Sequence, residues 1–355
     1  LWVEPEMVSP DSDLYRDHPD WALQIPGREQ TLGRNQLILD LSNPDVVDYL
    51  DRVLSEIIDS ARIRYLKWDM NRNMSEVGSA VARPDEQGAV PHRYMLGLYR
   101  LLDSLTSRFP DVLIEGCAGG GGRFDYGMLA YTPQFWTSDQ TDAAERLAIQ
   151  FGTSVMFPPE TMGAHVSAVP NHQVGRITPT TTRVDTALAF NFGFELDPAA
   201  ESEQNRIAYR EGAELYRRHR ELFRQGDFCR LVPDGAHAPG GVAPAGAGGG
   251  LGAFGTWGAG GAAGGGAHPV SGAGRTAWAV VAPDAHRAVV FYFQPLIGAN
   301  ADGGYVRLRG LDPWATYRDA ATGQVYDGAF LMDRGLWDPP AFGDFRSCRW
   351  ILERV

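Results

Sequence analysis

The stretch "YLKWDMN", residues 65–71, reads as a short apolar strand that ends in charged and amide side chains. Its lysine, Lys67, is the only lysine among the 32 basic residues of the chain, and the others are all arginines. Residues two apart on a strand point to the same face, so Lys67 and Asp69 are expected to enter one site together. This placement raises the question of what the two side chains do at the end of the strand.

The sequence around this stretch alternates apolar strand-like runs with amphipathic helical runs, up to about residue 225. The helical pattern is clearest in 44–59, where Asn43 is the expected N-cap and Pro44 the first helical residue. Near-continuous apolar strands separated by helices predict a parallel sheet that is buried on both faces. The predicted strands are 1–8, 35–42, 64–71, 111–119, 133–139, 152–157 and 189–196, and the other predicted helices are 93–109, 142–151 and 201–225.

Polar residues recur where these strands end, and this favours a closed barrel over an open doubly wound sheet. A (β/α)8 barrel builds its active site from the carboxyl ends of many strands. No strand leads into the G-x-G-x-x-G turn of a dinucleotide site. About seven strands are counted, so the prediction is an α/β fold, a (β/α)8 TIM barrel lacking its first strand. The strand-end residues are Glu4, Glu6, Asp40, Asp69, Cys117 and Asp139.

The second part of the chain predicts a different domain. After residue 225 come short runs with alternating polarity and Gly or Pro turns, as in Val306 and Leu308 against Arg307 and Arg309. They predict a small C-terminal antiparallel β-sandwich over 226–355. A Gly- and Ala-rich stretch at about 235–275 is expected to be a flexible insertion, because it has too little apolar surface to order itself. The barrel is assigned to 1–225.

The composition excludes several classes of partner. A net charge of −12 would repel nucleic acid and anionic membrane, and no apolar run is long enough to cross a bilayer. Cys117, Cys229 and Cys348 are far apart and odd in number, which fits neither a disulfide scaffold nor a thiolate metal site. His165 and His172 lack metal-binding spacing. We expect no metal, no cofactor and a reducing, cytoplasmic location.

Lys67 and Asp69 are the first pair of candidate functional residues. A nearby positive charge would keep Asp69 ionised and lower its pKa, as a nucleophile or a stabiliser of positive charge requires. An ordinary ion pair that closes a strand end is the alternative. A further alternative is a Schiff-base lyase that uses Lys67, although an ammonium beside a carboxylate should stay protonated.

Asp139 is the second candidate. It lies three residues after Trp136, whose indole and the accompanying desolvation would raise its pKa and favour a protonated acid. Asp142 is the better N-cap for the next helix, although Asp139 could also cap it. Two carboxylates tuned in opposite directions are the apparatus of glycoside hydrolysis, held about 5–5.5 Å apart in retaining enzymes and about 6.5–9.5 Å apart in inverting ones.

The segment "EGCAGGGGRFD", residues 115–125, lies between these two candidates. The glycines from Gly119 to Gly122 would let the backbone approach a ligand closely, with Cys117 as a small wall. A phosphate-binding loop would need a lysine directly after the glycines, and none is there. A tight turn without a ligand remains the alternative.

Six blocks of the chain together resemble the retaining α-galactosidases of glycoside hydrolase family 36, in the order of that family. The resemblance spans about residues 1–225 and implies a barrel with a C-terminal β domain and a double-displacement mechanism. It also implies a large N-terminal β-sandwich and a first barrel strand with paired aspartates. Neither is in this sequence, so we expect a chain truncated at its N-terminus, and an inactive fragment is one alternative. The blocks are "WVEPEMVSPDSDLY", "GRNQLILDLSNPDV", "YLKWDMNR", "EGCAGGGGRFD", "WTSDQTDAAERL" and "MGAHVS".

By the same resemblance Asp69 is the nucleophile and Asp139 the general acid/base. A small Cys117 near the galactose 2-hydroxyl would favour galactose over N-acetylgalactosamine. The implied substrates are α-galactosides of the melibiose and raffinose type, and the implied assembly is a homo-oligomer, a tetramer. Alternatives are a raffinose-type transglycosylase and a galactoside-binding protein without turnover. The implied sugar-binding residues are Trp2, Arg34, Lys67, Cys117, Gly119 and Trp136.

Overall fold

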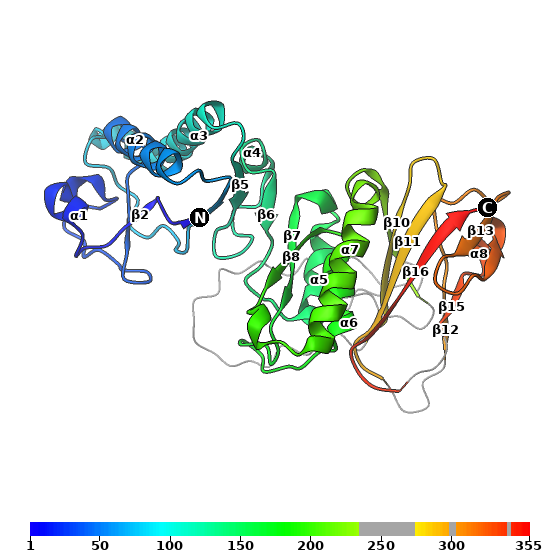
Figure 1. Ribbon diagram of the computed structural model, residues 1–355. Coiled ribbons are helices and arrows are strands. Elements are labelled where there is room, and N and C mark those ends of the chain that lie inside the picture. The colour runs from blue at the N-terminus through cyan, green and yellow to red at the C-terminus, as the bar shows by residue number, and fades with distance from the viewer. Residues whose placement is uncertain (234–273, 298–302, 339–341) are drawn as a thin grey trace, which may run out of the picture. The chain divides into compact units, whose positions relative to one another are not determined.

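The computed structural model describes residues 1–233, 274–297, 303–338 and 342–355 (Figure 1). Leu1–Asp139 form one compact unit and Gln140–Val355 form a second, and each contains its own hydrophobic core. All but the last two residues of the predicted insertion at 235–275 lie outside the described residues. The predicted domain boundary near residue 225 stays a prediction.

The first unit contains a parallel sheet in the order β1-β4-β5-β6. Its register aligns Trp2 with Lys67, Lys67 with Glu115, and Glu115 with Gln134, so these side chains share one face of the sheet. The carboxyl ends of the strands meet at one edge, where Asp69 and Cys117 follow β4 and β5. The strands are β1 (Trp2–Val3), β4 (Tyr65–Trp68), β5 (Leu113–Gly116) and β6 (Gln134–Trp136).

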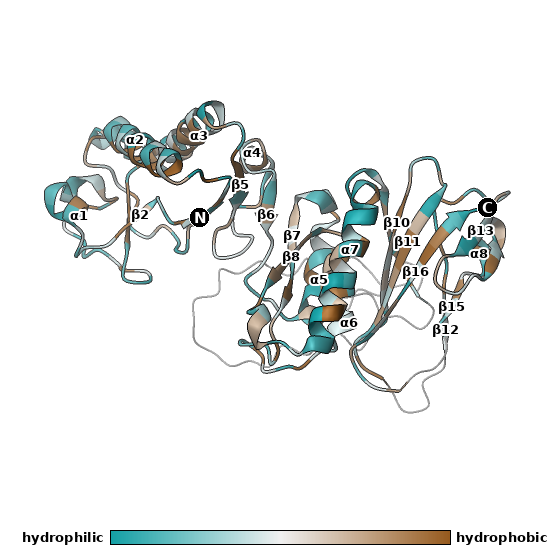
Figure 2. Ribbon diagram, in the orientation of Figure 1, coloured by the Kyte–Doolittle hydropathy of each residue, from teal (hydrophilic) through white to brown (hydrophobic). Residues whose placement is uncertain are grey.

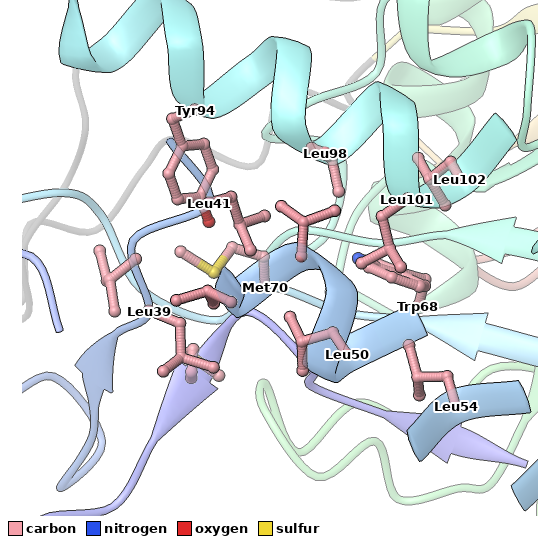
Figure 3. Close-up of a cluster of buried hydrophobic side chains, with 14 of the residues drawn as sticks. Leu39, Leu41, Leu50, Leu54, Trp68, Met70, Tyr94, Leu98, Leu101 and Leu102 are labelled. Atoms are coloured by element: carbon pink, nitrogen blue, oxygen red, sulfur yellow. The ribbon is translucent and has the colours of Figure 1, made fainter. Parts of the chain in front are cut away.

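Two long helices pack against each other in this unit, α2 (Pro44–Ser60) and α3 (Val90–Arg108). Helix α2 begins as predicted, with Pro44 at its start and the Asn43 side chain accepting a hydrogen bond from the backbone N–H of Asp45. Both helices show hydrophilic and hydrophobic stretches in Figure 2, as amphipathic helices do. Their leucines pack around Trp68 and Met70 from the end of β4 (Figure 3). This core fixes the strand that carries Asp69.

Shorter elements complete the first unit. Strands β2 (Met7–Val8) and β3 (Leu37–Ile38) pair with each other in antiparallel fashion. The prediction of a barrel strand at 35–42 is therefore wrong, because an apolar run does not specify the direction of its partner. The remaining elements are α1 (Asp13–Asp17), η1 (Pro19–Trp21), η2 (Pro84–Ala89) and α4 (Tyr126–Leu129).

The second unit begins with helices and a parallel pair of strands, β7 (Met162–Ser167) and β8 (Asn191–Glu195). The predicted strand at 152–157 is wrong. Helix α5 runs to Thr153, and Val155 and Met156 after it are 61% and 63% exposed, so this run belongs to the surface and not to a sheet core. The helices are α5 (Ala143–Thr153), α6 (Thr180–Leu188) and α7 (Glu203–Gln225), with η3 (Pro159–Thr161) and η4 (Pro198–Ala200) between them.

The same unit ends in an antiparallel sheet in the order β14-β13-β16-β11-β10-β9, with a separate pair β12-β15. Val306 and Leu308 are buried, as their alternation with arginines predicts. Among the described helices none is long and apolar enough to span a bilayer. The elements are β9 (Asp227–Leu231), β10 (Thr276–Val281), β11 (Arg287–Gln294), β12 (Gly304–Val306), β13 (Thr316–Asp319), β14 (Val325–Asp327), α8 (Gly328–Asp333), β15 (Leu336–Asp338) and β16 (Arg346–Arg354).

Candidate active site

Asp69 directly follows β4 and is only 6% exposed. Its Oδ1 accepts hydrogen bonds from the backbone N–H of Met70 at 2.9 Å and, more weakly, of Gly119 at 3.4 Å. Its Oδ2 accepts from the indole Nε1–H of Trp2 at 3.2 Å. Backbone donors from two strand ends and an indole from a third therefore fix the orientation of this carboxylate.

The pKa of Asp69 lies below its ordinary value, as predicted. Burial acts to raise this pKa, and four hydrogen-bond donors act to lower it: the side chains of Asn71, Cys117 and Trp2, and the backbone N–H of Met70. Each donor stabilises the ionised form. Asp69 is thus held as a carboxylate, which is the state that a nucleophile needs.

The prediction that Lys67 lowers the pKa of Asp69 is not confirmed, because the groups that lower it most are hydrogen-bond donors. The Lys67 ammonium lies 3.4 Å from Oε1 of Glu115, which is opposite Lys67 in the β4–β5 register. The same ammonium lies 5.1 Å from the centroid of the Trp136 ring, within the range of a cation–π contact. The neighbouring strand supplies a carboxylate partner for the lysine, and sequence spacing within β4 could not show this.

Cys117 is a buried wall of the site, 2% exposed. Burial, and next the charge of Asp69, raise the pKa of its thiol to about 12. The thiol therefore stays protonated at neutral pH and can donate a hydrogen bond to the Asp69 carboxylate. A small, neutral side chain at this position agrees with the role that the family resemblance implies.

The glycine loop, residues 119–122, donates a hydrogen bond to the Asp69 carboxylate and lies against the backbone at Asp139. Gly119 and Gly120 have φ angles of +55° and +85°, which L side chains rarely adopt. A Cβ on Gly120 would lie 2.9 Å from the backbone N of Asp139 and 2.9 Å from Cα of Ser138. Because Gly119 also donates to Asp69, this loop forms a direct physical link between the Asp69 and Asp139 segments.

Arg123 anchors the end of the glycine loop. Its guanidinium donates to both oxygens of Glu6, at 2.7 and 2.8 Å, and Glu6 is fully buried. Glu6 also accepts from Nε1–H of Trp68 at 2.8 Å and from the Tyr94 hydroxyl at 2.6 Å. The prediction that Glu6 lies on the ligand-facing rim is wrong, because all of these partners hold it in the core.

Asp40 is a second strand-end carboxylate that is not at the site. It is 1% exposed and accepts hydrogen bonds from the backbone N–H of Ser42 at 2.9 Å and from the hydroxyls of Ser42 and Ser79. These bonds close the turn after β3. Asp40 is therefore a structural residue, and the prediction that placed it on the barrel rim is wrong.

Arg34 is linked to Asp69 by a chain of polar contacts through Glu4 and Asn71. Its Nη1 lies 3.6 Å from Oε1 of Glu4, which also accepts from Nδ2 of Asn71 at 2.5 Å. Asn71 in turn lowers the pKa of Asp69. The Arg34 side chain is 59% exposed, so its guanidinium is available to a ligand hydroxyl. Sequence reasoning placed Glu4 correctly at the strand ends but did not assign a role to Asn71.

Asp139 follows β6 and is exposed, so the partial desolvation predicted for it is not observed. Its neighbour in sequence, Asp142, is the N-cap of α5 and accepts from the backbone N–H groups of Ala144 and Glu145. Asp139 is therefore not needed as the cap, as predicted. The raised pKa of Asp139 and its role as the acid/base stay predictions.

The described residues contain no cluster of histidine, cysteine or carboxylate side chains suited to a metal ion. His165 instead lies with Nδ1 3.5 Å from Oε2 of Glu195 on the adjacent strand. The site combines an ionised carboxylate, a protonated thiol, a lysine and two tryptophans on or just after parallel strands, with an arginine nearby. A carboxylate held ionised at the carboxyl end of a parallel strand is typical of the barrel glycoside hydrolases.

Comparison with known proteins identifies the family. Residues 1–226 match the model of the melibiase family, and residues 275–352 match the model of the glycosyl hydrolase family 36 C-terminal domain. The chain belongs to the melibiases of glycoside hydrolase family 36. The parallel strands are accordingly part of a (β/α)8 barrel, and the antiparallel sheet belongs to the C-terminal β-sandwich, as predicted.

A relative is alpha-galactosidase AgaA of Geobacillus stearothermophilus, 46% identical over 355 residues, which cover 100% of this chain and 44% of that enzyme. Its crystal structure in complex with raffinose matches with a TM-score of 0.87 at 45% identity, again over 100% of this chain and 44% of the other. A second crystal structure of that enzyme, with stachyose, matches with a TM-score of 0.86 at 46% identity and the same coverage. This chain thus spans less than half the length of these relatives.

Proposed function

We propose that the protein hydrolyses terminal non-reducing α-D-galactosyl residues of oligosaccharides such as melibiose and raffinose, with retention of configuration. The observation that carries the proposal is Asp69, a buried carboxylate held ionised by hydrogen bonds at the end of β4. The glycine loop that contacts both Asp69 and the Asp139 backbone supports it. The complexes of the Geobacillus enzyme with raffinose and stachyose indicate the substrate class.

The proposed reaction has two displacements. In the first, the Asp69 carboxylate attacks the anomeric carbon, the bond to the leaving oxygen breaks, and Asp139 gives that oxygen a proton. The product is a covalent β-galactosyl ester on Asp69. In the second, Asp139 takes a proton from water, whose oxygen attacks the same carbon. The ester bond to Asp69 breaks, the Asp69 carboxylate is regenerated, and galactose is released with its original α configuration.

The surrounding residues have complementary roles in sugar binding. Lys67 and Arg34 would donate hydrogen bonds to sugar hydroxyls, and the rings of Trp2 and Trp136 would pack on the apolar face of the sugar. Cys117, being small and protonated, would lie near the 2-hydroxyl and leave no room for a 2-acetamido group. The raffinose and stachyose complexes of the relative also carry substituted aspartates, to asparagine and to alanine respectively. Those two aspartates are separated by the same number of positions as Asp69 and Asp139.

The test uses protein expressed from the complete reading frame and p-nitrophenyl α-galactoside as substrate. Asp69→Ala should lose on the order of 10⁴-fold or more in kcat. Added azide should then form β-galactosyl azide, because it attacks from the side that Asp69 has vacated. In Asp139→Ala, azide should instead intercept the galactosyl-enzyme and form α-galactosyl azide. Undiminished turnover by Asp69→Ala would contradict the proposal, and galactose binding without turnover in the unsubstituted protein would favour a binding protein.

We also propose that the protein assembles as a homotetramer and acts in the cytoplasm. The family resemblance supports the first part, and the three free cysteines support the second. Light scattering of the protein from the complete reading frame, and fractionation of the producing cells, are the measurements that decide these two points.

A further inference from the structure

Glu115 is a buried carboxylate of the site to which the proposed mechanism gives no role. It lies on β5, is 2% exposed, and occupies the position opposite Lys67 in the parallel register. Its Oε1 is 3.4 Å from the Lys67 ammonium. A carboxylate is rarely buried to this extent unless it is paired. The pairing with Lys67 therefore indicates what Glu115 does in the site.

The second oxygen of Glu115 is held from the neighbouring strands. Nε2 of Gln134, on β6, donates to Oε2 of Glu115 at 3.0 Å and to the Tyr65 hydroxyl at 2.9 Å. The Tyr65 hydroxyl, on β4, in turn donates to the same carboxylate oxygen. Residues on three adjacent strands thereby fix the carboxylate, and its other oxygen, Oε1, is the one that lies 3.4 Å from the Lys67 ammonium.

Lys67 has two carboxylates within reach of its flexible side chain. Glu115 lies across the strand, and Asp69 lies two residues further along β4 on the same face. In the structure the ammonium is with Glu115 and over the ring of Trp136. If the ammonium moved to Asp69, it would occupy a lone pair of the attacking oxygen and weaken the nucleophile.

We propose that Glu115 is a positioning residue, whose carboxylate holds the Lys67 ammonium away from Asp69 and directed toward a sugar hydroxyl. This inference rests on the proposed function, because it assigns Asp69 the role of nucleophile. The Glu115 carboxylate contacts Lys67, Tyr65 and Gln134, and the role assigned to it is to position Lys67. It acts through the position of a single side chain.

The test is a double-mutant cycle on the protein from the complete reading frame, with Glu115→Gln and Lys67→Met. Glu115→Gln keeps the shape and removes the charge, and we expect about a 10²-fold loss in kcat/KM, carried mainly by kcat because the lysine then pairs with Asp69. In the Lys67→Met background the same substitution should cost less than about 3-fold. An equal loss in both backgrounds would show that Glu115 has only a structural role and would overturn the inference.

A binding measurement adds a readout that does not depend on turnover. We expect Lys67→Met to weaken the binding of 1-deoxygalactonojirimycin, a compound that the Geobacillus relative binds, and Glu115→Gln to weaken it no further when Lys67 is absent. Additive losses of affinity would count against the inference.

If Glu115→Gln does not fold, Gln134→Ala replaces it. Gln134 is only partly buried, and its loss removes one of two donors to Oε2 of Glu115, while the Tyr65 hydroxyl still donates to that oxygen. We expect a smaller decrease in kcat that again disappears in the Lys67→Met background, and a decrease that persists there would overturn the inference. The proposed function is tested separately by Asp69→Ala. If that variant is inactive while the cycle is additive, only the role of Glu115 fails.

Discussion

Replacing Arg123 with methionine tests how strongly the glycine loop depends on its buried anchor. Glu6 is fully buried, and Arg123 supplies two of its four hydrogen bonds and its counter-charge. Breaking a buried ion pair by removing one partner costs about 3–5 kcal/mol, because the other charge stays buried and uncompensated. This is a large part of the 5–15 kcal/mol of free energy of unfolding that is typical of a domain. We expect Arg123→Met to lower the free energy of unfolding by that amount at pH 7.

The pH dependence separates this cause from a simple loss of packing. Burial acts to raise the pKa of Glu6, but the charge and hydrogen bonds of Arg123, with those of Tyr94 and Trp68, hold the pKa below its ordinary value. In the unsubstituted protein Glu6 therefore contributes stability above its unfolded-state pKa, and this stability is lost as the pH falls through the folded-state pKa. In Arg123→Met, burial raises the pKa, so the carboxyl takes up a proton on acidification and the deficit should shrink between pH 7 and pH 5.

The assay is urea unfolding, followed by tryptophan fluorescence at both pH values. Arg100→Met is the matched control, because Arg100 pairs with Asp48 on the surface, where both side chains are more than half exposed. An exposed pair of this kind contributes about 0.2–1 kcal/mol. Equal losses for the two variants, or a deficit for Arg123→Met that does not change between pH 7 and pH 5, would refute the reasoning.

Three further predictions concern the site. Gly120→Ala and Gly27→Ala both force a side chain into positive φ, but only the Cβ at Gly120 meets backbone atoms, at 2.9 Å, while nothing lies within 4 Å at Gly27. We expect about a 10²-fold loss of kcat/KM in the first variant only, and similar losses in both would contradict this. Asn71→Ala removes a donor that lowers the pKa of Asp69, so the acid limb of the kcat/KM profile should move to higher pH; an unmoved limb would exclude that role. The Cys117 thiol, with its pKa near 12, should react with iodoacetamide at pH 8 far more slowly than free cysteine does, and rapid labelling located by mass spectrometry would disprove its protonated state.

The local patterns of the sequence were sufficient to predict most of the helices and strands of the barrel part. The start of α2 follows from Asn43 and Pro44, and the start of α5 follows from Asp142, because capping is decided within a few residues. The same reasoning failed where partners come from elsewhere in the chain. The apolar run of β3 could not reveal that it pairs in antiparallel fashion with β2.

In the site, too, the partners that come from distant parts of the sequence could not be predicted. The lowered pKa of Asp69 was predicted, but Lys67 was assumed to be its cause because the two residues are close in sequence. The structure pairs Lys67 with Glu115, 48 positions away along the chain but adjacent in the register of the sheet. Glu6 was likewise placed on the rim, because its partner Arg123 is far away in sequence. To predict an ion pair between two strands, one must know the register of the sheet, and a single sequence does not contain it.

Since every basic residue of this chain other than Lys67 is an arginine, an amine reagent has few targets here. Reductive methylation with ¹³C-formaldehyde would label the Lys67 side chain, which is 27% exposed. The methyl resonance of Lys67 would then serve as a spectroscopic reporter inside the proposed sugar pocket, and titration with galactose could be followed by NMR in a variant that carries out no chemistry.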